Sequence, residues 1–146
     1  MSLSSENQIK IAILDLYEGV PNEGMRGIRQ LIEEYEADFH LPVIHEVFDV
    51  RLKTQVPDLS FDVYISSGGP GSPLDSEGSL WERKYFSLIE SIKAHNQQHP
   101  EQKKHVLLIC HSFQIFCRQY GFGLVSKRKS TSFGVMPIHK TFEGHH

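Results

Sequence analysis

Residues 104–116 read KHVLLICHSFQIF, and this stretch decides the fold. Its aliphatic run, residues 105–109, predicts a buried β-strand that stops at Cys110. A short amphipathic segment that begins at His111 predicts a helix directly after the strand. A cysteine at such a junction lies on the first backbone amides of a helix, where the positive end of the helix dipole favours a thiolate. The stretch therefore predicts a strand, a sharp turn carrying a nucleophilic thiol, and a helix.

The composition is that of one ordinary globular domain. The chain has 146 residues, of which 39% are hydrophobic and 23% charged, so it is long enough to bury one core. The net charge of −3 offers no electrostatic argument for nucleic acid or an anionic membrane as a partner. No apolar run approaches the roughly 20 residues that a membrane helix needs, and two cysteines are too few for a disulfide scaffold. We therefore expect a cytoplasmic protein.

Both ends of the chain resemble additions made for expression. Residues 1–3, MSL, are typical of a vector remnant, and residues 143–146, EGHH, are typical of a shortened polyhistidine tag. We therefore expect a single domain over residues 4–142. We also expect the natural chain to continue beyond that point.

Apolar residues alternate along the chain between the spacing of strands and that of helices. Strands are predicted at residues 9–16, 43–50, 61–66, 105–109 and 133–138, and helices at residues 23–37, 80–96 and from 111 onward. Asn22 and Ser79 are predicted N-caps, the latter in a capping box with Glu82. This alternation predicts an α/β fold with a doubly wound, mostly parallel, flavodoxin-like sheet in the strand order 2-1-3-4.

Three predicted loops meet at one edge of this sheet. Ligands bind beyond the carboxyl ends of parallel strands, and residues 17–22, residues 67–73 and the turn at Cys110 all follow strands. The glycine-rich loop at residues 67–73 is therefore expected beside Cys110. An attacking thiolate creates an oxyanion, which needs preorganised N–H donors. The backbone amides of Gly69 and His111 are the predicted donors, and glycine lets the backbone approach a ligand closely.

The segment SSGGPGSP, followed by a strand that ends in C-x-S-x-Q, resembles the class I glutamine amidotransferase domain. The resemblance extends from the aliphatic first strand to the late segment FGVMPIHKT. It implies that a thiolate attacks the side-chain amide of glutamine or a related amide, forms a γ-glutamyl thioester, and releases ammonia to a synthase domain or subunit. By position, Cys110 matches the nucleophile, and Gly69 and His111 match the oxyanion hole. Gln114 and Gly68 match substrate-binding positions, and neither a metal nor a cofactor is implied.

The chain departs from the family pattern around the nucleophile. Leu108 and Ser112 stand where the family has glycines that relieve crowding in a strained turn. Phe113 stands where many members have histidine, and no His-x-Glu pattern follows Gln114, although such a histidine is the family's general base. Loss of the base lowers the rate by roughly two to four orders of magnitude. We therefore expect the N-terminal part of a longer protein, with little or no glutaminase activity of its own.

Other interpretations remain open at this point. One alternative is a non-catalytic relative that keeps the fold for binding or assembly, and another is that Cys110 is a small buried hydrophobe at a strand end. The loop at residues 67–72 lacks the Lys-Ser/Thr pair of a phosphate-binding loop, and no residue supports flavin binding. The histidines show no metal-ligand spacing.

Three further expectations concern individual side chains and the edge of the sheet. Adjacent helix positions diverge, so the His111 ring is expected to point away from the thiol. Glu18 and Asn22 lie at the functional edge, where substrate contact and local capping explain them equally well. A sheet that ends early exposes an edge strand and apolar surface, so we expect a homodimer or a soluble aggregate.

Overall fold

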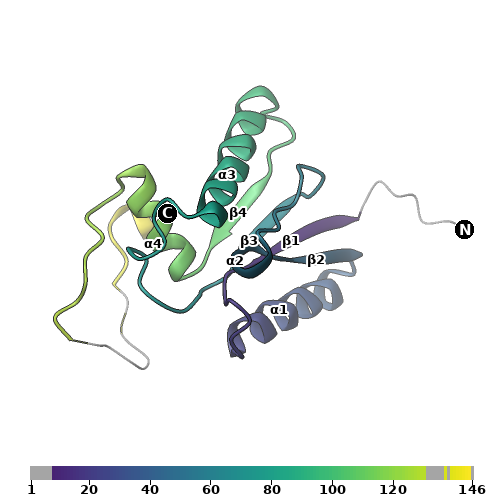
Figure 1. Cartoon of the computed structure of the whole chain (residues 1–146). Helices are drawn as coiled ribbons and strands as arrows, with labels where there is room; N and C mark the ends of the chain where they lie inside the picture. The colour runs from purple at the N-terminus through teal and green to yellow at the C-terminus, as the bar shows by residue number, and fades with distance from the viewer. Residues whose placement is uncertain (1–7, 131–136, 138, 146) are drawn as a thin grey trace, which may run out of the picture.

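The structure is a computed structural model of the chain and describes residues 8–130, 137 and 139–145 (Figure 1). The strands are β1 (Ile9–Asp15), β2 (Val43–Asp49), β3 (Val63–Ser66) and β4 (His105–Leu108), and the helices are α1 (Glu23–Phe39), α2 (Val50–Lys53), α3 (Leu80–Gln98), α4 (His111–Tyr120) and the short 3-10 helix η2 (Glu143–His145). The strand predicted at residues 133–138 lies outside the described residues, apart from Pro137.

The four strands form one parallel sheet in the order β2-β1-β3-β4, as predicted. The register aligns Leu14 of β1 with Ser66 of β3, and Ser66 with Leu108 of β4. Because these residues are level with one another and the strands are parallel, the loops that follow them leave the sheet at the same edge. This register brings the glycine-rich loop next to the turn at Cys110.

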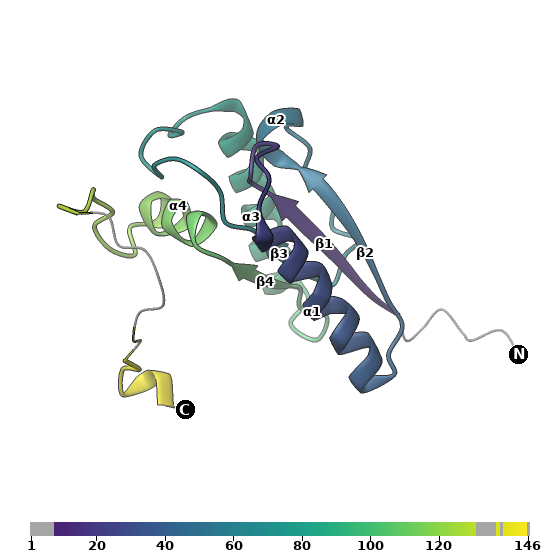
Figure 2. The same cartoon turned by 90° about the horizontal axis from the view of Figure 1, so that it is seen from below.

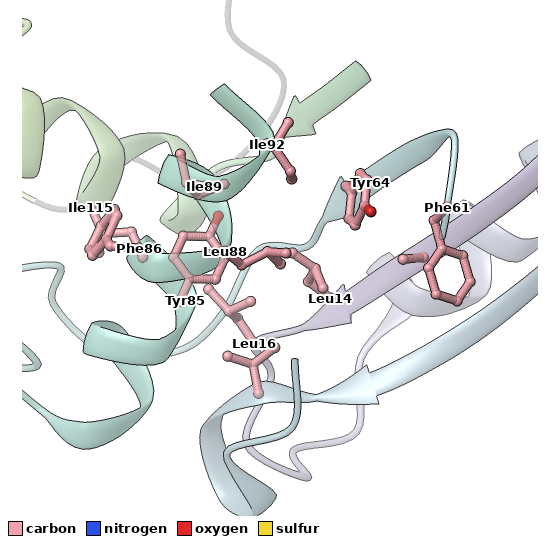
Figure 3. Close-up of a cluster of buried hydrophobic side chains, with 12 residues drawn as sticks. Leu14, Leu16, Phe61, Tyr64, Tyr85, Phe86, Leu88, Ile89, Ile92 and Ile115 are labelled. Carbon is pink, nitrogen blue, oxygen red and sulfur yellow. The ribbon is translucent and has the colours of Figure 1, made fainter. Parts of the chain in front are cut away.

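Helices cover both faces of the sheet, as in doubly wound α/β proteins. Figures 1 and 2 show α1 on one face and α3 on the opposite face. Strand β1 contributes to both layers, because its side chains alternate between the faces. Ile11 and Ile13 pack with α1, whereas Ala12 and Leu14 belong to a larger cluster with α3 and with Ile115 of α4. Figure 3 shows this larger cluster.

The helix starts follow the predicted capping residues. The Asn22 side chain accepts a hydrogen bond from the Met25 amide at 2.8 Å, so its capping role is confirmed. The Ser79 hydroxyl accepts from the Glu82 amide at 3.4 Å. The second half of the predicted capping box is wrong, because the Glu82 carboxylate bonds to Ser76 and to Arg118 instead of to the amide of Ser79.

Strand β4 is exposed, and the prediction that this run is buried is wrong. Val106 is 36% exposed and Leu107 is 55% exposed, although both belong to an aliphatic run. The reason is position: β4 lies at the edge of the sheet, and no strand among the described residues pairs with its outer side. An apolar groove of about 590 Å³ lies beside it on the α3 face, and another of about 380 Å³ lies on the α1 face.

None of the helices in the described part of the chain combines the length and the apolar character that crossing a bilayer demands.

Candidate functional site

The backbone turns sharply at Cys110, between β4 and α4. Cys110 has φ 52° and ψ −105°, a conformation that non-glycine residues rarely adopt. Such strain is kept where surrounding structure over-determines it, and a strained turn between a strand and a helix is the geometry of a nucleophile elbow. The Cys110 side chain is exposed and makes no capping hydrogen bond to α4. Its sulfur is therefore presented to solvent at the carboxyl edge of the sheet.

Ser112 stabilises this turn through the hydrogen bonds of its hydroxyl group. Its side chain is fully buried, and its hydroxyl lies 3.0 Å from the carbonyl oxygens of both Ser66 and Ile109. The same hydroxyl accepts a hydrogen bond from the Ile109 amide at 2.9 Å. A serine at this position therefore fits the turn and links the end of β4 to the end of β3.

The glycine-rich loop lies against Cys110, as the strand order predicted. A Cβ atom placed on Gly68 would lie 3.5 Å from the Cys110 Cβ. A Cβ placed on Gly69 would lie 2.5 Å from the carbonyl oxygen of Leu16, at the end of β1. Backbone atoms cannot give way as a flexible side chain does, so the close approach requires glycine at position 69.

The two predicted oxyanion donors lie in the two segments that meet at this edge. His111 is the first residue of α4, so helix geometry leaves its amide without an intrahelical partner. Within the described residues, the Gly69 amide donates to no backbone or side-chain acceptor. Gln114 lies one turn into α4 with an exposed side chain, and its amide donates to the Cys110 carbonyl at 3.0 Å. The amide side chain of Gln114 is therefore accessible near the start of the helix.

Arg51, which the sequence analysis missed, holds the glycine-rich loop from the side of β2. Its guanidinium donates to the carbonyl oxygens of Pro70 (2.8 Å) and Leu16 (3.3 Å) and pairs with Glu18 at 2.9 Å. The same guanidinium lies 5.4 Å from the centre of the Trp81 ring. The pair explains Glu18 as part of this clamp. The sequence could have indicated Arg51, because residues directly after a parallel strand such as β2 must also emerge at the carboxyl edge of the sheet.

Arg118 holds the other end of the same loop, and it was also missed. It lies on α4, the helix that begins after Cys110, and it bonds to the Pro73 carbonyl and to the Glu82 carboxylate. The Arg118 and Glu82 side chains are 9% and 3% exposed. Removing one partner of such a buried pair typically costs about 3–5 kcal/mol. Nothing in the local sequence pairs two residues 36 positions apart.

The His111 ring is buried, whereas the neighbouring Cys110 side chain is exposed. His111 is 1% exposed, and neither ring nitrogen has a hydrogen-bond partner in the described part of the chain. Burial lowers the pKa of His111 and the positive charge of Arg51 lowers it further; the Glu82 carboxylate opposes this shift, and Arg118 adds a smaller lowering. The ring is therefore held neutral, and the contribution of His111 to the site is its backbone amide.

In the part of the chain that the structure describes, no three or more His, Cys, Asp or Glu side chains come together in a way that could hold a metal ion.

No protein-family model matches the chain. No curated protein matches it either. Among solved structures, it is similar to "Crystal structure of SMU.1228c", with 21% sequence identity and a TM-score of 0.45. The match covers 77% of this chain and 44% of that chain, so this chain spans less than half the length of the protein that it resembles. A likeness at this level supports neither a function nor a shared site.

Proposed function

We propose that this chain has the flavodoxin-like fold of a class I glutamine amidotransferase domain and that Cys110 is its nucleophile. The observation that carries the proposal is the strained backbone of Cys110, at φ 52° and ψ −105°, beside the Gly68–Gly69 segment. A cysteine held in this way presents its sulfur while two backbone segments offer N–H donors next to it. Burial alone, the competing explanation of Cys110, does not fit an exposed side chain.

The proposed reaction begins on the side-chain amide of glutamine or a related amide. The Cys110 thiolate attacks the amide carbon, and the oxygen takes the negative charge beside the amides of Gly69 and His111. The C–N bond then breaks, the nitrogen takes up a proton, and ammonia leaves a γ-glutamyl thioester on the sulfur. Water hydrolyses the thioester to glutamate and restores the thiol. Gln114 and Gly68 would contact the substrate.

Proton transfer is the weak step of this arrangement. No imidazole among the described residues is hydrogen-bonded to Cys110, and the buried His111 ring has no hydrogen-bond partner there. Without a base that delivers a proton to the leaving nitrogen, the rate falls by roughly two to four orders of magnitude. We therefore propose that this chain binds and attacks the amide far better than it turns it over, and that a synthase domain or subunit is the acceptor of ammonia. Rapid ammonia release from glutamine by this chain would refute the hypothesis that it lacks a general base.

Labelling with a glutamine-analogue diazoketone tests the nucleophile without requiring turnover. We expect mass spectrometry to find the adduct on Cys110, and we expect excess glutamine to slow its formation. Cys117→Ser should label as the unaltered chain does, whereas Cys110→Ala should not label. Labelling that glutamine does not slow, or equal labelling of both cysteines, would show a merely reactive thiol. That outcome would favour the non-catalytic relative that serves binding or assembly.

A further inference from the structure

Tyr17 occupies a space made by two glycines at the carboxyl edge of the sheet. A Cβ atom added to Gly24 of α1 would overlap the Tyr17 hydroxyl. On the other side, a Cβ on Gly68 would lie 3.0 Å from the same oxygen. The Tyr17 backbone is also held, because its amide donates to the Asp15 carboxylate at 2.8 Å. The hydroxyl therefore has a defined place, set by elements on both sides of it.

The Tyr17 hydroxyl and the Cys110 side chain lie against the same glycine. The Cβ position of Gly68 is 3.0 Å from the hydroxyl oxygen and 3.5 Å from the Cys110 Cβ. The exposed sulfur of Cys110 can rotate about its Cα–Cβ bond toward the hydroxyl. Within the described residues, the hydroxyl forms no hydrogen bond, to Cys110 or to any other acceptor, so it is available to a rotated sulfur.

The charges around Tyr17 keep it a donor. Burial raises the pKa of Tyr17, and the negative charges of Cys110 and Asp15 raise it further. The hydroxyl is therefore protonated at neutral pH, and an O–H group is a hydrogen-bond donor. The two glycines against which the hydroxyl lies, Gly24 of α1 and Gly68 of the loop, carry no charge.

We propose that the Tyr17 hydroxyl donates a hydrogen bond to the Cys110 sulfur when that sulfur is a thiolate. The proposal rests on the proposed function, in which Cys110 is the nucleophile. The bond stabilises the thiolate, because a hydrogen bond to an ionised group is roughly twice as strong as one between neutral groups. Tyr17 thus sets how much of the thiol is in its reactive form, and the backbone amides serve the oxyanion.

The rate of iodoacetamide alkylation, measured against pH in a Cys117→Ser background, tests the proposal. Tyr17→Phe keeps the ring between the two glycines and removes only the hydroxyl. We expect the midpoint of the rate profile to rise by about one pH unit, because a charge-assisted hydrogen bond of about 1.5 kcal/mol is lost. Tyr35→Phe is the matched control, because that ring lies on α1 against Phe39, and its midpoint should not move. Equal midpoints of the alkylation profile for Tyr17→Phe and for the chain that keeps Tyr17 would overturn the proposal.

A second measurement covers the case in which Tyr17→Phe does not fold. Alkylation of Cys110 removes its negative charge, so the ultraviolet titration of the tyrosines should shift one ionisation to lower pH after alkylation. An unchanged titration would also overturn the proposal. Neither measurement uses glutamine, so the outcome is separate from the diazoketone test. If the chain fails to label with the diazoketone but shows the midpoint shift, the Tyr17 inference is supported and the proposed substrate is refuted.

Discussion

Strands β1 and β4 have similar aliphatic sequences and very different surroundings. In β1, the side chains of Ala12, Ile13 and Leu14 are fully buried between α1 and α3. In β4, Val106 and Leu107 are 36% and 55% exposed at the edge of the sheet. Both strands nevertheless end at the same carboxyl edge of the sheet, where Tyr17 follows one and Cys110 follows the other. The difference teaches that an aliphatic run identifies a parallel strand but does not tell whether neighbours cover it.

The largest expected effect is on stability, and it tests the difference in burial between β1 and β4. Leu14→Ala removes a side chain with no exposed surface, so we expect the free energy of unfolding to fall by about 2–5 kcal/mol. Leu107→Ala removes a side chain that is already half exposed, so we expect a loss of less than about 1 kcal/mol. Urea unfolding followed by circular dichroism measures both. Both are measured at a concentration low enough for the chain to be monomeric, and equal losses there would mean that another part of the same chain covers β4.

The next effect concerns the end of β1 and the loop that packs on it. Gly69→Ala places a Cβ 2.5 Å from the Leu16 carbonyl oxygen, so we expect a loss of about 1–3 kcal/mol and slower diazoketone labelling of Cys110. Gly27→Ala is the matched control, because a Cβ at that helical position meets no atom within 4 Å. This control should gain up to about 1 kcal/mol from helix propensity. A Gly69→Ala chain that unfolds and labels as before would contradict the close approach.

The third effect tests whether the open edge is an association surface. We expect the chain to form a homodimer or a soluble aggregate through β4, and Leu107→Lys to weaken association by at least about tenfold, as measured by light scattering. Leu52→Lys is the control, because that side chain is 58% exposed but lies on α2, after the strand at the opposite edge. An unaltered chain that is monomeric at high concentration would count against the prediction.

The smallest effect concerns the pH dependence of stability. The pKa of His111 is lowered in the folded chain, so below about pH 6.5 the unfolded chain binds the proton more readily. The free energy of unfolding therefore falls as the pH drops through that value. Urea midpoints measured on either side of it should differ less in His111→Gln than in the unaltered chain. The same difference in both chains would show that the His111 ring is not held neutral.

Much of the fold was predictable from local patterns. The strand order followed from alternating strands and helices, and the glycine-rich loop was expected beside Cys110 for the same reason. Asn22 was recognised as an N-cap because capping depends only on neighbouring residues. The burial of β4 was predicted wrongly, because no property of residues 105–109 reports what lies on either side of them in space.

The sequence by itself determined where the strands lie, the turn that carries Cys110 and the meeting of that turn with Gly68 and Gly69. These features follow from hydrophobic spacing and from the parallel geometry of the sheet. Only the tertiary structure decided that Arg51 and Arg118 hold the two ends of the loop, that Tyr17 faces the same glycine as Cys110, and that β4 is open. Such contacts join residues that are far apart in sequence. Their energies depend on distances and burial that no local pattern contains.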